Sequence, residues 1–223
     1  MKHLLTISLA LLLLSACSTA QLDLPAGAMT VEGSNPRIWN RPIAFGPYRT
    51  AWVDEGTRRS WLADLNLVSF GRADQAYHLA LGETAIDCHT REFVIGRNGF
   101  YLDPTLGRSP LLVCGFDQGG ARTTLLLSKT GKAEPSLRGE IRTVGADGPA
   151  LSVASLHRPV GAVIGSAEPF GYEIRSGERV VGIVETMNRG RVWIDPALDQ
   201  AEQDKLAAAA AALLLFRDPD AGE

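Results

Sequence analysis

The feature that most constrains this fold is an uninterrupted apolar segment near the end of the chain. Residues 206–216 are eleven consecutive Leu, Ala and Phe residues. A helix that is apolar on every side cannot lie on a surface that faces water, so other parts of the protein or lipid must surround it. Eleven helical residues span only about 16 Å, whereas a bilayer crossing needs about 20 residues. The segment therefore predicts a helix buried in the core of a domain.

Residues on either side of this segment predict where the helix begins and ends. Asp195 and Pro196 form a sound start, with Asp as the N-cap and Pro at the first helical position. Arg217 suits the negative end of the helix dipole, and Pro219 stops the helix. These signals predict a helix over 196–217. Two alternatives stay open: an amphipathic helix docked on a sheet, and insertion of the segment into a membrane or a partner.

The preceding part of the chain, from about Arg37, predicts many short strands. Apolar runs recur about every ten residues, and turn residues such as Asn98-Gly99 and Ser176-Gly177 separate them. The clearest runs are Tyr48 to Val53, Tyr77 to Leu81, Leu111 to Phe116, Thr123 to Ser128 and Val180 to Thr186. The fold class is therefore mainly β, an antiparallel barrel or sandwich of about twelve short strands. Arg58 to Leu65 is interpreted as one short helix.

The start of the chain has the pattern of an export signal. Residues 4–14 are almost entirely apolar, which is long enough for a signal-peptide core and too short for a membrane span. The run ends in Leu14-Ser15-Ala16-Cys17. This ending resembles the lipobox of bacterial lipoproteins, in which small residues precede an obligate cysteine. The alternative is an ordinary secretory signal in which the cysteine is incidental.

The lipobox resemblance implies a specific processing of the chain. Residues 1–16 would be removed, and Cys17 would carry a diacylglyceryl thioether and an acylated amino terminus. Three acyl chains hold a protein firmly on a membrane, whereas one binds marginally. Ser18 follows the cysteine, which resembles the outer-membrane sorting pattern of Gram-negative lipoproteins. We therefore expect a chain anchored in the cell envelope, at the outer membrane facing the periplasm.

The mature chain is expected to have three parts. Residues 17–36 are rich in Ser, Thr, Gly, Asn and Pro and predict a flexible, lipidated tether. Residues 37–217 predict a single β domain that ends in the apolar helix, and 218–223 form a tail. The predicted partners are membrane lipid, through Cys17, and an envelope protein.

Two further cysteines lie in strand-like runs. An exported chain meets an oxidising compartment, in which Cys88 and Cys114 would persist as a disulfide. Two buried free thiols are an alternative. A metal site is a third, but a zinc ion needs four ligands and only His89 lies close in sequence. The sequence therefore predicts a disulfide and no metal ligand.

The β runs and the terminal helix together resemble a known superfamily. The stretch from Phe170 to Gly182 looks like a hairpin that repeats a short apolar motif around a Gly turn, and residues 199–216 resemble a terminal helix. The resemblance is to the tubby, LURP-one and phospholipid-scramblase superfamily. It implies a twelve-stranded barrel around a central helix, over about residues 40–216. The basic headgroup cluster of tubby domains and a calcium loop are both missing here.

Charge and motifs exclude several activities. The chain has 22 Lys and Arg against 25 Asp and Glu, so it lacks the basic excess of a nucleic-acid binder. The sequence contains no G-x-S-x-G, H-E-x-x-H or P-loop motif. Isolated histidines and carboxylates remain, and none of them is predicted to be catalytic. They are His78, His89, His157, Asp87, Glu92, Asp103 and Asp117.

Aromatic and basic residues give weaker indications. Trp52 and Trp193 lie in strand-like runs and are expected in the core, whereas Trp39 and Trp61 would suit a binding surface. The N-terminal part of the domain is locally basic, which would suit contact with anionic headgroups, but a solvated face is the favoured explanation. Its arginines are Arg37, Arg41, Arg49, Arg58 and Arg59.

These features predict a non-enzymatic lipoprotein, without cofactors, that binds a protein partner or a lipid at the membrane surface. The alternative is an envelope hydrolase or another enzyme whose site the sequence does not reveal. A deep cleft with two or more convergent polar groups would favour the enzyme.

Overall fold

The computed structural model describes most of the chain after residue 20. The described residues are 21–33, 42–54, 56, 59–65, 68–97, 100–102, 110–130, 136–145, 150–161, 165–166 and 168–217. Within 59–65, 68–73, 92–97 and 100–102 the description covers the backbone alone.

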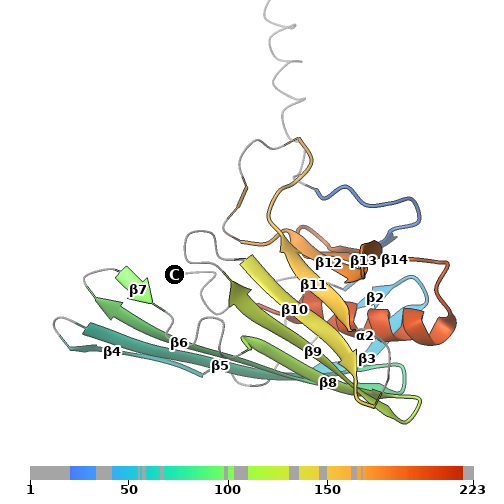
Figure 1. The fold of residues 1–223 in the computed structure, drawn as a ribbon. Coiled ribbons are helices and arrows are strands. Elements are labelled where there is room, and N and C mark those ends of the chain that lie inside the picture. The colour runs from blue at the N-terminus through green and yellow to red at the C-terminus, as the bar shows by residue number, and fades with distance from the viewer. Residues whose placement is uncertain are drawn as a thin grey trace, which may run out of the picture.

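Most of these residues lie in one antiparallel sheet (Figure 1). Its strands are β1 (Met29–Thr30), β2 (Ala44–Phe45), β3 (Tyr48–Asp54), β4 (Arg59–Leu65), β5 (Val68–Leu81), β6 (Thr84–Arg97), β7 (Phe100–Leu102), β8 (Leu112–Gln118), β9 (Ala121–Thr130), β10 (Ser136–Thr143), β11 (Leu151–Leu156), β12 (Gly171–Ser176), β13 (Arg179–Glu185) and β14 (Arg191–Ile194). Helix α2 spans Gln200–Leu215.

Twelve of these strands follow one another around a nearly closed barrel. Their order is β1, β14, β13, β12, β11, β10, β9, β8, β6, β5, β3 and β2. Glu32 and Ala44 exchange two backbone hydrogen bonds of 2.8 and 3.0 Å, which join the two ends of this path. The predicted mainly β class is confirmed, and of the two predicted architectures the structure has the barrel.

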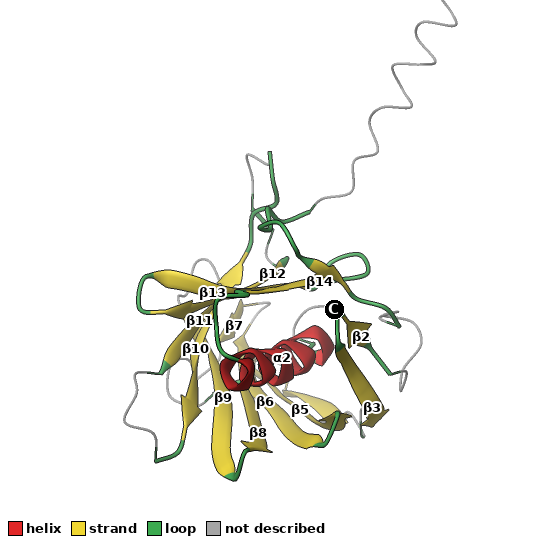
Figure 2. Ribbon diagram, turned by 90° about the vertical axis from the view of Figure 1, so that its right-hand side faces the viewer, coloured by secondary structure: helices red, strands yellow, loops and turns green. Residues whose placement is uncertain are grey.

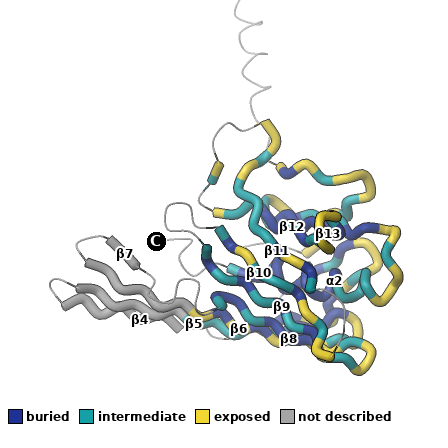
Figure 3. Tube along the Cα trace, viewed as in Figure 1, coloured by how far each residue is buried: buried dark blue, intermediate teal, exposed yellow. Residues whose placement is uncertain are grey.

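Helix α2 lies inside the ring of strands (Figure 2). Every residue from Leu206 to Leu214 is buried. The alternating strands turn apolar side chains towards it, as in β9, where Leu125 and Leu127 are buried and the residues next to them are not. Six consecutive alanines, 207–212, make the helix thin, so a ring of twelve strands can close around it. Buried residues recur along the strands that surround it (Figure 3). The prediction of a core helix is confirmed.

The helix begins four residues later than the sequence predicts. Asp199, not Asp195, is the N-cap, and its Oδ1 accepts a hydrogen bond from the Glu202 amide at 2.8 Å. Asp195 instead pairs with Arg179 and accepts from the Ala197 amide. The expected helix over 196–217 was therefore too long at both ends. An ion pair with Arg179 holds Asp195 in the barrel wall, and the backbone of the C-cap residue, Phe216, is extended.

Residues Arg59–Leu65 form strand β4 rather than the expected short helix. All seven residues pair with β5, from Arg59 opposite Asp74 to Leu65 opposite Val68. Strands β5 and β6 have 14 residues each, and their far halves leave the barrel together with β4 and β7 (Figure 1). Pairing with β5 provides hydrogen-bond partners for the backbone of this segment. This long-range pairing outweighs the local helical pattern.

One predicted turn falls within the described residues. Ser176 lies opposite Arg179, so Gly177 and Glu178 form a two-residue hairpin loop. Gly177 has a φ of 60°, a left-handed conformation that favours glycine. The other predicted turn, Asn98-Gly99, lies outside the described residues.

Candidate functional site: the N-terminal clamp and the disulfide

The N-terminal segment is held to the barrel at Leu22. The Leu22 amide donates to Glu185 Oε1 at 2.9 Å, and the Arg191 guanidinium donates to the Leu22 carbonyl at 2.8 Å. Arg191 also pairs with the second carboxylate oxygen of Glu185. Glu185 is only 1% exposed, and Leu22 is buried as well. Glu185 thus accepts from the amide of Leu22, Arg191 donates to the carbonyl of the same residue, and the two side chains pair with each other. We call this group the N-terminal clamp.

The clamp belongs to a longer contact between the N-terminal segment and the barrel. The Val160 amide donates to the Gln21 carbonyl at 2.9 Å. Strand β1 pairs with β14, and Val31 is 1% exposed in the core. The described part of the expected flexible tether, 21–33, is therefore attached to the barrel near both of its ends, and the domain begins before residue 37. The polar composition of this segment suggested a tether. Composition does not reveal that backbone groups of the segment form hydrogen bonds with distant parts of the chain.

Sequence reasoning missed the two residues of the clamp. The available signal was a glutamate at the end of the apolar run of β13, followed by an arginine across a tight connection. A buried carboxylate needs a cationic or hydrogen-bonding partner, which a strand neighbour can supply. The sequence could not reveal that the third partner is Leu22, 163 residues away from Glu185.

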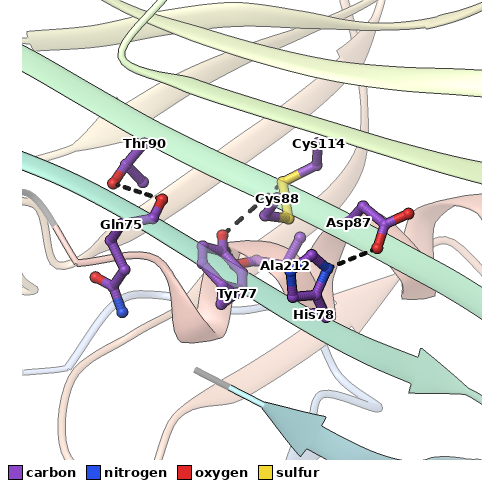
Figure 4. The surroundings of a disulfide bond; sticks show 8 residues. All are labelled: Gln75, Tyr77, His78, Asp87, Cys88, Thr90, Cys114 and Ala212. Carbon is purple, nitrogen blue, oxygen red and sulfur yellow. Dashed lines mark hydrogen bonds and ion pairs between the residues drawn. A yellow bond between two sulfur atoms is a disulfide. The ribbon is translucent and has the colours of Figure 1, made fainter. Parts of the chain in front are cut away.

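Cys88 and Cys114 form a disulfide in the barrel wall (Figure 4). They lie directly opposite each other on β6 and β8, with a Cα–Cα distance of 4.1 Å. Both side chains are 0% exposed. The Tyr77 hydroxyl lies 3.8 Å from Cys114 Sγ and donates to the Ala212 carbonyl of α2 at 2.9 Å. This arrangement fastens two strands together and ties them to the core helix.

The neighbouring histidine lies on the other face of the barrel wall. Because side chains alternate along a strand, Cys88 points into the core while His89 is exposed. His78 Nδ1 lies 2.7 Å from Asp87 Oδ1, and the rings of His78 and His89 are 6.2 Å apart. His89 therefore cannot act on the disulfide. Within the described ranges no three His, Cys, Asp or Glu residues are placed to hold a metal ion.

Trp52 is not in the core. Its side chain is 46% exposed on the outer face of β3, whereas the adjacent Val53 is buried. Trp193 is half-buried. The register of β3 on β5 shifts between Thr50 and Trp52, so the alternation of β3 is interrupted and Ala51 and Trp52 are both exposed between buried Thr50 and Val53. The sequence did not reveal this irregularity.

One serine and one histidine form the closest approach to a nucleophile and base. Ser155 Oγ lies 2.7 Å from His157 Nε2, and His157 Nδ1 lies 3.0 Å from the Ser166 carbonyl. The Leu137 amide donates to the same Ser155 Oγ at 2.8 Å. The carbonyl can only accept, so Nδ1 carries the proton and the Ser155 hydroxyl donates to Nε2. This chain of hydrogen bonds also joins β10, β11 and the following loop.

A cavity of about 330 Å³ lies elsewhere, near the start of α2. The walls of this cavity are mainly apolar. The ammonium group of Lys205, which lines the cavity, donates to Glu202 Oε1 at 2.6 Å. A second cation, Arg142, is paired with Glu140; that hydrogen bond lowers the pKa of Glu140. The cavity does not include Ser155 or His157. It is lined by Ile141, Arg142, Thr143, Ala150, Leu151, Ser176, Val181, Leu198, Glu202, Lys205 and Leu206.

Of the remaining residues from the sequence analysis, the structure describes two with their side chains. Asp117 pairs with Arg122 on the surface at 3.0 Å, and Arg49 is exposed. For the others, the position or the side chain lies outside the described residues. They are Cys17, Arg37, Trp39, Arg41, Arg58, Arg59, Trp61, Glu92 and Asp103.

The pair of Asp195 and Arg179 makes stability depend on pH. The pKa of Asp195 lies below its ordinary value, first because the Ala197 amide donates to Oδ1 and then because Arg179 donates to Oδ2. A lowered folded-state pKa adds stability above the unfolded-state pKa of about 3.9, and this stability is lost as pH falls through the folded-state pKa.

Asp195→Asn should therefore lower the urea midpoint at neutral pH and reduce the further drop in acid. The measurement is a series of urea titrations between roughly pH 6 and pH 2. Asp117→Asn, which removes an exposed carboxylate from a surface pair, is the matched control and should change little. Equal pH profiles of wild type and Asp195→Asn would contradict the assignment.

Comparison of the chain with protein-family models, with curated proteins and with solved structures found no match. Among the described residues, no helix is both long enough and apolar enough to cross a membrane.

Proposed function

We propose that this chain is an envelope lipoprotein whose barrel is a non-enzymatic binding or structural module for a protein partner or a lipid. The observation that carries this proposal is the position of α2. Its segment from Leu206 to Leu214 fills the inside of the barrel, where a ligand-binding barrel would hold its ligand. Recognition would then use the outer surface and the loops.

The N-terminal clamp supports the anchoring part of this proposal. It fixes Leu22 on the barrel, five positions after the proposed lipidation site at Cys17. The clamp therefore keeps the barrel close to the residue that the proposed anchor would modify. The proposed location is the outer membrane, facing the periplasm, on the evidence of Ser18.

A barrel around a central C-terminal helix is also the architecture that the resemblance to the tubby, LURP-one and scramblase superfamily implies. Membership of that superfamily stays a prediction. No headgroup or calcium site is proposed from it, because the sequence lacks the residues for either.

The experiment that tests the proposal is intact mass spectrometry of the protein purified from its native membrane. The expected mass is that of residues 17–223 with three acyl chains, and reduction should add two hydrogen atoms. Cys17→Ser is the matched control, because it keeps the barrel and should abolish acylation. An unacylated wild-type protein that leaves the membrane fraction in salt would overturn the lipoprotein proposal.

The enzyme alternative rests on Ser155 and His157. The same mass measurement tests it when the protein is first treated with a fluorophosphonate, which forms a covalent adduct with an activated serine. We expect no adduct, because the cavity near the start of α2 does not include Ser155 and the Leu137 amide already donates to Ser155 Oγ. An adduct that is absent in Ser155→Ala would overturn the non-enzymatic proposal in favour of a serine hydrolase.

A further inference from the structure

The N-terminal clamp limits how far the barrel can lie from the lipid anchor. Gln21 is the first residue that the structure describes on the barrel, and four peptide units separate it from Cys17. A fully extended chain of that length spans at most about 14 Å. If Cys17 is lipidated, as proposed above, the part of the barrel next to Gln21 must lie within that distance of the headgroup layer.

The loop after β11 occupies that position. The Val160 amide donates to the Gln21 carbonyl at 2.9 Å, so this loop and the N-terminal segment touch (Figure 1). The side chain of Val160 is 66% exposed, the largest exposed fraction among the large apolar side chains of the described residues. Arg158 is exposed beside it and has no ion pair within the described part of the chain. An apolar tip with a cation suits the boundary between headgroups and acyl chains.

The base of this loop is fixed to the barrel. The Ser166 amide donates to the His157 carbonyl at 2.8 Å, and His157 Nδ1 donates back to the Ser166 carbonyl at 3.0 Å. His157 Nε2 accepts from Ser155 of β11. The histidine therefore closes the loop and joins it to the strand, which gives the pair of Ser155 and His157 a structural role.

We propose that the loop 157–161 is a membrane-contact site, with Val160 inserted at the phospholipid headgroup layer, and that the short clamped segment after Cys17 holds the barrel in this one orientation. The occupant is the bilayer that carries the lipid anchor. This inference rests on the proposed lipidation of Cys17.

The opposite end of the barrel provides a matched control position. Val144 is 62% exposed, almost as much as Val160, and it follows β10 at the far end of β11. The six residues of β11 alone separate the two ends by about 20 Å. The orientation proposed here places Val160 at the lipid surface and Val144 in water.

The test uses the full lipidated chain with one added cysteine, either Val160→Cys or Val144→Cys. Each is the only reactive thiol, because Cys88 and Cys114 are bonded to each other and Cys17 is acylated. The thiol is labelled with the fluorophore NBD, and the protein is reconstituted into phosphatidylcholine and phosphatidylglycerol vesicles that contain a spin-labelled lipid. At position 160 we expect the NBD emission to shift to shorter wavelength and the spin-labelled lipid to quench most of its intensity. At position 144 we expect neither the shift nor the quenching.

The two proposals can fail separately. Absence of acylation in the mass spectrum would remove the anchor. Acylated protein in which both labels stay in water, or in which both are quenched, would keep the anchor and overturn the orientation. A twenty-residue Gly-Ser insertion after Ser18 leaves the barrel unchanged and should weaken quenching at position 160. Full quenching at position 160 in that variant would show that the short segment between Cys17 and the clamp is not what holds Val160 at the bilayer.

Discussion

Ala210→Asp should unfold the barrel. Ala210 is 1% exposed at the centre of α2, and the residues on either side of it along the helix are all apolar. A carboxylate there would lose its hydration without gaining a partner, which costs several kcal/mol even if it takes up a proton. That cost is comparable to the whole stability of a domain, about 5 to 15 kcal/mol.

The helix itself supplies the control for this prediction. Ala201 is exposed in the first turn of α2, so Ala201→Asp makes the same chemical change near the positive end of the helix dipole. Circular dichroism during heating should show a cooperative transition for wild type and for Ala201→Asp, and none for Ala210→Asp. A normal melting curve for Ala210→Asp would mean that α2 is not enclosed by the barrel.

Removal of the disulfide should have the second largest effect. The bond closes a loop between residues 26 apart in sequence, for which the chain-entropy model gives about 3.5 kcal/mol. Replacing both Cys88 and Cys114 with Ala should lower the free energy of unfolding by at least that amount, because the buried sulfur atoms also leave space behind. Urea titration followed by tryptophan fluorescence measures the difference.

Reduced wild-type protein separates the two contributions. It keeps both sulfur atoms, so its difference from the oxidised protein reports the bond, and the double Ala variant adds the lost packing. Both cysteines are 0% exposed, so the folded protein should also resist reductant until urea unfolds it. Equal stability of the oxidised and reduced forms would contradict the role of the bond in holding β6 to β8.

Several features of the fold could be predicted because they depend on local composition. The all-apolar stretch from Leu206 to Phe216 must be covered wherever it lies, and the alternating runs must form strands with one face inside. An exported chain with Cys88 and Cys114 in such runs predicts a disulfide. Each of these inferences follows from the chemistry of neighbouring residues and needs no knowledge of distant partners.

Predictions that needed a distant partner failed or were not made. Asp195 looks like an N-cap, but Arg179 holds it in the barrel wall. Arg59–Leu65 looks helical, but β5 pairs with all of it. Trp52 looks like a core residue, but the register of β3 on β5 places it outside. In each case a long-range hydrogen bond or a strand register outweighed a local preference of about 1 kcal/mol or less.

The candidate site shows the same division. By itself the sequence determined the apolar core helix, the β class and the residues available for a lipid anchor and a disulfide. Only the tertiary structure decided that Glu185 and Arg191 bind the backbone of Leu22, and that Val160 meets Gln21. The physical reason is that the sequence shows that a buried carboxylate or a backbone amide needs a hydrogen-bond partner, but it does not show which group that partner is. Which groups become those partners depends on how the chain closes the barrel.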